Sequence, residues 1–152
     1  MFRVLMYGLA TGLWSGYAPK APGTVTSALT VVAVYFLLPH STGWPLLLAF
    51  LVSSGLGVWS STYVEQHSAR HDPGFITIDE VAGQLLTFAF VPLDWRVALA
   101  GFCLFRVFDI WKPGLIRKAG HLKAGWGVMA DDWLAGLCAC AVLHGLVWIL
   151  WK

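Results

Sequence analysis

The residues in this sequence best suited to chemistry are its few, grouped carboxylates. Most of the eight acidic residues lie in short polar motifs at the ends of hydrophobic runs. Ionisable groups beside apolar segments are costly to keep and are usually functional. Several carboxylates that converge repel one another unless a cation lies among them, and hard oxygen ligands favour Mg²⁺, Mn²⁺ or Ca²⁺. We therefore predict a metal site in which the main ligands and catalytic residues are Glu80, Asp109, Asp131 and Asp132, with Asp79 and Asp72 as weaker candidate ligands.

Cationic and hydroxyl side chains accompany these acids. Arg106 and Asp109 are three residues apart and share a helix face, and Lys112 follows one turn later. Pro22-Gly23 before an apolar run is typical of a helix start, whose free backbone N–H groups can receive an anion. A metal and cations on one side of a site can hold a phosphate between them. The predicted substrate-binding residues are Thr24, Ser27, Arg106, Lys112 and His71.

Each motif also has a purely structural interpretation. Asp79 and Asp131 could cap the helices that follow them, and Arg106 could form a simple ion pair with Asp109. Three acidic sites at one membrane face are more than capping requires, so we favour the functional interpretation. Glu65 and Asp94 are expected to be solvated surface residues.

Composition indicates that the chain works in a membrane. Of 152 residues, 58% are hydrophobic and 12% are charged, and the mean hydropathy is +0.70. A water-soluble protein needs more polar surface than this. The length fits one domain, residues 1–152. The net charge of +2 without a basic tract argues against nucleic acid as a partner.

Five hydrophobic segments stand out, at residues 24–38, 44–63, 80–91, 96–110 and 133–151. In lipid the backbone polar groups must be paired within the protein, which leaves helices or closed barrels, and these segments lack the alternation of a barrel. We predict an all-α integral membrane bundle of about five hydrophobic helices. A short interfacial or re-entrant helix is expected at the N-terminus.

If all five segments span, the connecting loops alternate between the two sides. One side then receives nearly all the positive charge, and the positive-inside rule makes that side cytoplasmic. The acidic motifs fall on the same side. Small residues after two of the acidic pairs, at Gly83 and Gly136, would let their helices approach closely. The two acidic pairs would then come within reach of one metal.

Several motifs run in order along nearly the whole chain: residues 21–24 with Ser27, Asp72-Pro73, and then residues 78–83, 105–113, 125–132 and 135–136. In these motifs the chain resembles the bacterial phosphatidylglycerophosphatase A family. The resemblance implies a Mg²⁺-dependent phosphatase of the inner membrane that removes the terminal phosphate of phosphatidylglycerophosphate, giving phosphatidylglycerol and inorganic phosphate. A bulkier residue and a second proline are expected in relatives where this chain has Gly114-Leu115.

The predicted reaction is metal-assisted hydrolysis of a phosphomonoester at the cytoplasmic face. One member of each acidic pair should bind the metal, because neighbouring residues on a helix point ~100° apart. The nucleophile is either a water held by the metal or a carboxylate; we favour water, because no aspartyl-phosphate motif is present. The rival functions are a divalent-cation binding or transport protein, a phosphatase for another lipid phosphate, and a CDP-alcohol phosphotransferase, whose longer acidic pattern is missing here.

Overall fold

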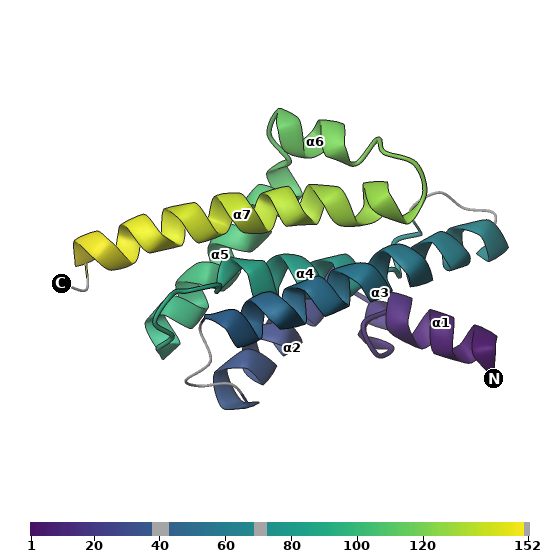
Figure 1. The fold of residues 1–152 in the computed structure, drawn as a ribbon, viewed down its shortest axis with the longest axis horizontal. Helices are drawn as coiled ribbons and strands as arrows, with labels where there is room; N and C mark the ends of the chain where they lie inside the picture. Colours follow the sequence, from purple (N-terminus) through teal and green to yellow (C-terminus); the bar gives the residue numbers. More distant parts are fainter. Residues whose placement is uncertain (38–42, 69–72, 151–152) are drawn as a thin grey trace.

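The computed structural model describes residues 1–37, 43–68 and 73–150, which form helices joined by turns and loops and include no strand. The predicted all-α fold is confirmed. The elements, shown in Figure 1, are α1 (Phe2–Ala10), the 3₁₀ turn η1 (Ser15–Tyr17), α2 (Pro22–Leu37), α3 (Trp44–Ser68), α4 (Ile78–Thr87), α5 (Trp95–Trp111), α6 (Leu115–Ala119) and α7 (Gly125–Leu150).

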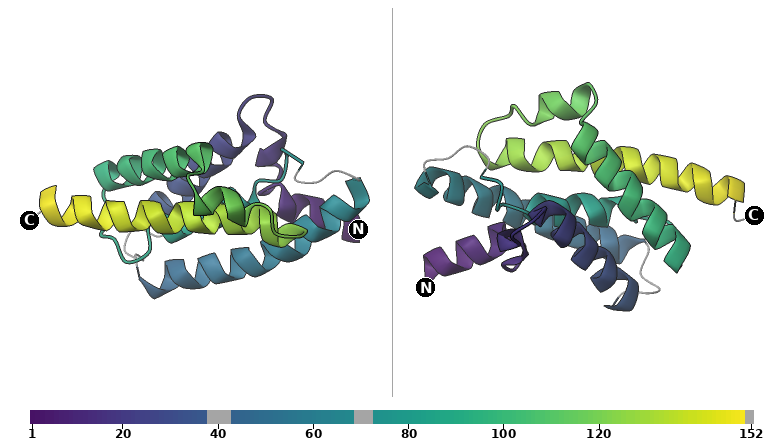
Figure 2. Two further views of the ribbon diagram at one scale, coloured as in Figure 1. Left: turned by 90° about the horizontal axis from the view of Figure 1, so that it is seen from above. Right: turned by 180° about the vertical axis from the view of Figure 1, so that it is seen from behind.

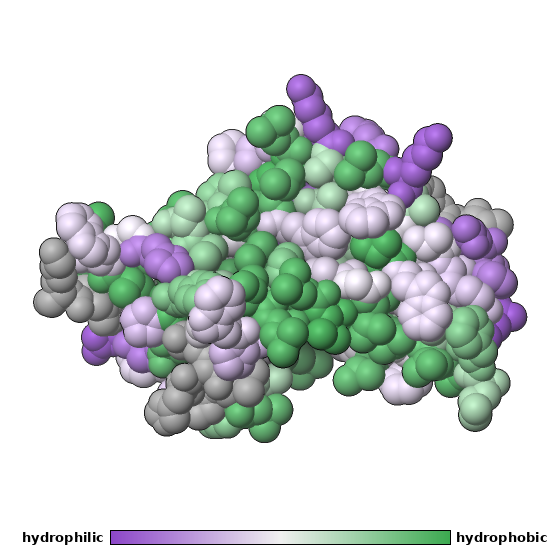
Figure 3. Space-filling view, viewed as in Figure 1, coloured by the Kyte–Doolittle hydropathy of each residue, from purple (hydrophilic) through white to green (hydrophobic). Residues whose placement is uncertain are grey.

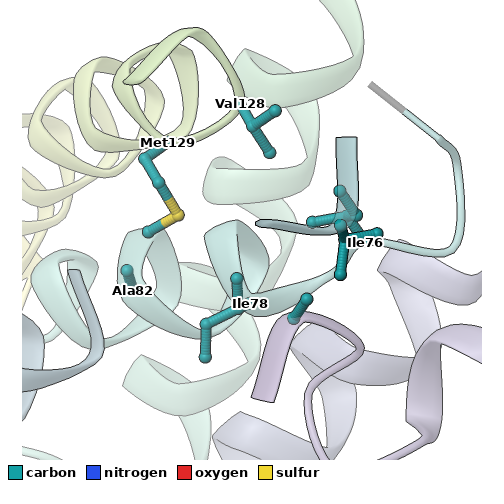
Figure 4. Packing of buried hydrophobic residues seen from close by; sticks show 7 residues of the cluster. Ile76, Ile78, Ala82, Val128 and Met129 are labelled. Atoms are coloured by element: carbon teal, nitrogen blue, oxygen red, sulfur yellow. The ribbon is translucent and has the colours of Figure 1, made fainter. Parts of the chain in front are cut away.

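The short helix α4 lies at the centre of the bundle. It packs against α7, α3, α2 and α5, while α6 lies against the first half of α7 (Figure 1). Most of its side chains are buried, Glu80 and Gln84 among them. Its Ile78 and Ala82 pack with Val128 and Met129 of α7 in a hydrophobic cluster, shown in Figure 4. The polar side chains of Glu80, Gln84 and Thr87 are therefore enclosed by neighbouring helices.

Two glycines set the distance between α4 and α7. A Cβ atom at Gly136 would lie 2.4 Å from the backbone oxygen of Gly83. A Cβ atom at Gly83 would in turn lie 2.8 Å from the backbone oxygen of Asp132. The two helix backbones touch at this crossing, as the small residues predicted. The close crossing brings the acidic first turn of α4 beside the acidic pair of α7.

Two helices, rather than five, are long and apolar enough to cross a membrane among the residues described. These are α3 and α7, with 25 and 26 residues. The other predicted spans correspond to α2, α4 and α5, with 16, 10 and 17 residues. At 1.5 Å per residue, α4 is about 15 Å long, half the thickness of the hydrocarbon layer. The prediction of five hydrophobic helices is therefore not confirmed, and α4 is an internal helix.

The two capping alternatives do not hold, and one expectation about a single residue was wrong. Helix α7 begins at Gly125 instead of residue 133, so Asp131 lies inside the helix and is not its cap. Thr77, and not Asp79, is the N-cap of α4. Asp94 caps α5 by accepting hydrogen bonds from two backbone N–H groups. Glu65 is buried in α3 instead of solvated.

The surface separates into apolar and polar regions. In Figure 3 hydrophobic residues cover the middle of the molecule, and hydrophilic residues gather at the top and right, around α6, the start of α7 and the end of α3. The basic residues of α6 belong to this polar end. The predicted N-terminal helix is present as α1, which packs against α3.

Candidate metal and phosphate site

Three carboxylates from three helices meet beside the α4–α7 crossing. Glu80 of α4, Asp109 of α5 and Asp132 of α7 each offer an oxygen within 4.8 Å of the other two. All three residues are buried, with exposed fractions of 8%, 6% and 2%. The Oδ2 atom of Asp132 has no hydrogen-bond partner within the described residues. A buried carboxylate oxygen without a partner is costly, and a bound cation would remove that cost.

Arg106 holds two members of this triad from one side. Its guanidinium donates to Oε2 of Glu80 and lies 2.9 Å from Oδ2 of Asp109. Ser27 of α2 also donates to Oε2 of Glu80, at 2.9 Å. Arg106 and Asp109 form the ion pair that their spacing allows, but Glu80 makes it part of a larger network. The Glu80 carboxylate is therefore fixed in place by two donors from two different helices.

Lys112 holds the opposite side. Its ammonium group lies 2.5 Å from Oδ2 of Asp131 and 3.6 Å from Oδ1 of Asp109. Lys112 ends α5 in the left-handed conformation, with φ +46°, and its backbone N–H still bonds to Phe108. Burial opposes the charge of Lys112, but the hydrogen bond that Lys112 donates to Asp131 and the charges of the neighbouring carboxylates outweigh it and raise the pKa of the lysine above its ordinary value. Lys112 therefore stays charged at neutral pH.

The start of α2 closes over Glu80. A Cβ atom built at Gly23 would lie 1.9 Å from Oε1 of Glu80, so only glycine permits this approach. Pro22 occupies the first helical position, where its missing N–H costs nothing. The Pro-Gly pair thus brings the positive end of the α2 dipole next to a carboxylate.

A polar cavity of about 300 Å³ opens onto the triad. Glu80, Asp109 and Asp132 line it, together with Asp79 and Lys112. Its remaining walls come from Gly23, Ile110 and the segment before α4, at Gly74, Ile76 and Thr77. This segment was absent from the predicted site. The Thr77-x-x-Glu80 spacing of a capping box was a signal that could have drawn attention to it, although the Thr77 side chain makes no capping hydrogen bond.

The charges of the site fit a divalent cation. Burial, followed by the negative charge of Asp109, raises the pKa of Glu80 above its ordinary value, against the lowering effect of Arg106 and Ser27. Glu80, Asp109, Asp131 and Asp132 together face the two cations Arg106 and Lys112, which leaves an excess of negative charge. A small ion with hard oxygen ligands would balance that excess and supply the missing partner of Asp132.

The predicted site residues are only partly brought together. Asp79 lines the cavity but is outside the triad, and Asp131 forms an ion pair with Lys112. Ser27 touches Glu80 and is not a cavity-lining residue. Thr24, half-buried in the first turn of α2, is not a lining residue either. Two predicted members, His71 and Asp72, lie outside the described residues.

The sequence matches a known family over nearly its whole length. The profile described as phosphatidylglycerophosphatase A covers residues 8–147, which include every residue of the triad and both cations. The chain belongs to the phosphatidylglycerophosphatase A family. The family resemblance of the motifs is thus confirmed.

Individual relatives of this phosphatidylglycerophosphatase A family member carry two different names. Proteins of Escherichia coli and Haemophilus influenzae named phosphatidylglycerophosphatase A are 33% and 37% identical over 90% and 93% of this chain and 80% and 89% of their own. A Bacteroides thetaiotaomicron protein, provisionally named phosphatidylinositol-3-phosphatase, is 35% identical over 93% of both chains. All three names denote lipid phosphatases. No solved structure matches the chain.

Proposed function

We propose that this protein is a Mg²⁺-assisted lipid phosphatase that converts phosphatidylglycerophosphate to phosphatidylglycerol and inorganic phosphate. The observation that carries the proposal is the buried triad Glu80, Asp109 and Asp132, whose Asp132 oxygen has no partner among the residues described. The polar cavity beside it and the family membership support the same reaction.

The three triad carboxylates would hold the metal, which would offset the negative charge of the phosphate and make its phosphorus easier to attack. Lys112 lines the cavity and is placed to contact a phosphate oxygen. Arg106 forms ion pairs with Glu80 and Asp109 and would hold these two ligands in position around the metal. Asp79 lines the same cavity, outside the triad, where it would orient the attacking water and accept its proton.

The contacts around the site support this function over its rivals. Arg106 and Lys112 contact the same carboxylates that would have to conduct a cation, which argues against transport. A phosphatase for another lipid phosphate is the second candidate, because one relative is named for a phosphoinositide. Two of the three relatives are named for phosphatidylglycerophosphate, which we therefore take as the substrate.

We further propose that the enzyme lies in the bacterial inner membrane with its site facing the cytoplasm. The basic residues Arg117, Lys118 and Lys123 lie at the polar end, and the positive-inside rule places them in the cytoplasm. Labelling of Lys123→Cys in sealed cells tests this. Labelling by a reagent that reaches only the periplasm would overturn the orientation.

Phosphate release by the purified protein tests the reaction. Phosphatidylglycerophosphate, phosphatidylinositol 3-phosphate and phosphatidic acid are compared in mixed micelles, with Mg²⁺ and with a chelator. We expect the highest kcat/KM for phosphatidylglycerophosphate, and loss of turnover with the chelator. Phosphate release from phosphatidylinositol 3-phosphate alone would favour the second candidate function, a phosphatase for another lipid phosphate. No release from any lipid, with a folded protein, would refute the phosphatase.

A further inference from the structure

An apolar groove is lined by residues of α2 and α5. The right panel of Figure 2 shows these two helices from behind the bundle. The groove encloses about 320 Å³, within the range of ~300–1,000 Å³ for small-molecule sites. Two of its lining residues, Ala28 and Ala98, are small, and the other lining side chains are larger. The groove is lined by Ala28, Val31, Val32, Tyr35, Phe36, Trp95, Ala98, Leu99 and Phe102.

One end of this groove adjoins the carboxylate site. On α2, Ala28 directly follows Ser27, the residue that donates to Glu80. On α5, Phe102 lies one turn before Arg106, whose guanidinium is 3.4 Å from the Ser27 hydroxyl. From that polar end the groove extends for about 12 Å along α2, the rise of the eight residues from Ala28 to Phe36.

We propose that this α2–α5 groove binds one acyl chain of the lipid whose phosphate occupies the carboxylate site. The inference rests on the proposed function, because it assumes a lipid phosphomonoester as substrate. Both helices that form the groove carry residues of the site, so a phosphate there and a chain in the groove are connected along the same two helices. The anionic linkage between them would lie near Arg106.

A second, larger apolar groove of about 920 Å³ lies between α2 and α3. Its walls also include α4, which carries Glu80, whereas α3 contributes no residue to the carboxylate triad or to the two cations that contact it. The polar side chains among its lining residues carry only neutral hydroxyls, and those of Ser15 and Thr26 lie 2.5 Å apart. The α2–α5 groove, with the cation Arg106 one turn beyond its lining residue Phe102, is the better match to an anionic lipid.

Filling the groove tests the proposal. Val32→Trp places a larger side chain at a position that is 52% exposed, where it does not disturb the core. Each methylene removed from an apolar contact costs about fourfold in affinity. For long-chain phosphatidylglycerophosphate we expect KM to rise about 15-fold, which corresponds to two lost methylene contacts. For the deacylated, water-soluble headgroup the kinetic constants should stay within twofold of wild type.

Two control variants decide where the chain lies. Leu29→Trp fills the α2–α3 groove from a position that is 54% exposed. Leu51→Trp changes a similarly exposed residue that lines neither groove. Both should keep the wild-type KM for the long-chain lipid. A larger effect of Leu29→Trp than of Val32→Trp would overturn the proposal, as would equal losses on both substrates or no loss from Val32→Trp.

Photo-crosslinking separates this proposal from the proposed function. The probe is phosphatidylglycerophosphate with a diazirine at the end of one 16-carbon chain, bound to the wild-type protein in detergent micelles. Adducts should map to Val32, Phe36, Trp95 and Leu99, and Val32→Trp should remove them. Adducts spread evenly over the exposed faces of α3 and α7 would refute the groove. If the wild type crosslinks in the groove but releases no phosphate, the proposed function fails while the lipid site stands.

Discussion

Gly23→Ala is the most direct test of how the site is built. The new Cβ atom would lie 1.9 Å from Oε1 of Glu80. A carbon and an oxygen rarely come closer than ~3.3 Å, so the carboxylate must retreat by roughly 1.4 Å. Glu80 cannot simply rotate away, because Ser27 and Arg106 hold its other oxygen. The displacement therefore separates one metal ligand from the other two.

The expected result is a large loss of activity with little loss of stability. A misplacement of about 1 Å in an active site can cost about hundredfold in rate, so kcat should fall by at least that factor. The concentration of Mg²⁺ needed for half-maximal activity should also rise. The melting temperature in detergent should change by no more than a few degrees, because Gly23 lies in the first turn of α2 and outside the hydrophobic clusters.

Gly55→Ala is the matched control. Gly55 is also helical, and a Cβ atom there would meet nothing within 4 Å. This variant should keep wild-type activity and match or slightly exceed wild-type stability, since alanine favours helix by up to ~1 kcal/mol over glycine. If Gly23→Ala kept more than a third of wild-type kcat at the same Mg²⁺ concentration, the proposed contact between α2 and Glu80 would be wrong.

Three further predictions concern the carboxylates, the lysine and the helix crossing. Asp132→Asn should lower kcat more than about hundredfold, because Asp132 is a proposed metal ligand. Asp131→Asn should lower kcat about ten- to hundredfold, because Asp131 contacts Lys112 and not the metal. Equal phosphate-release rates of the two variants would contradict these different roles. The raised pKa of Lys112 means that its charge-dependent stabilisation is complete below the ordinary value of 10.5 and is lost only as pH rises through the folded-state pKa. Lys112→Arg should therefore keep the wild-type shape of the pH–rate profile from pH 7 to 10. A fall in wild-type activity toward pH 10 that is missing from Lys112→Arg would refute this. Gly136→Ala should destabilise the protein by about 1–3 kcal/mol through contact with Gly83, whereas Gly145→Ala, with open space around it, should not. Thermal unfolding in detergent measures the difference, and equal melting temperatures would refute the close crossing.

Much of the site followed from residue type and spacing. Arg106 and Asp109 share a helix face by spacing alone, and the structure pairs them at 2.9 Å. The glycines Gly83 and Gly136 indicated a close approach of two helices, which the structure shows directly. The sequence also predicted that the members of each acidic pair would point in different directions. Local features sufficed for these inferences, because each depends only on the helical repeat or on the small size of glycine.

Other features needed the packed bundle. The predicted start of the last helix was eight residues late, because the polar Asp131-Asp132 pair was taken as the edge of the hydrophobic run, whereas α7 begins at Gly125. Glu65 is buried although the residues that follow it, Gln66 to Ser68, are polar. The five predicted spans depended on hydrophobicity, which does not distinguish a helix buried in protein from one surrounded by lipid. The apolar side chains of α4 pack against other helices and not against lipid.

The sequence by itself determined the helical class, the family and the set of acids from which a metal site could be built. The tertiary structure decided which acids meet. Glu80 and Asp132 join Asp109, while Asp79 lines the cavity and Asp131 pairs with Lys112. Adjacent residues on a helix point ~100° apart, so each choice depends on which face of α4 and of α7 turns inward. That orientation is set by contacts between residues far apart in the chain, which no local pattern records.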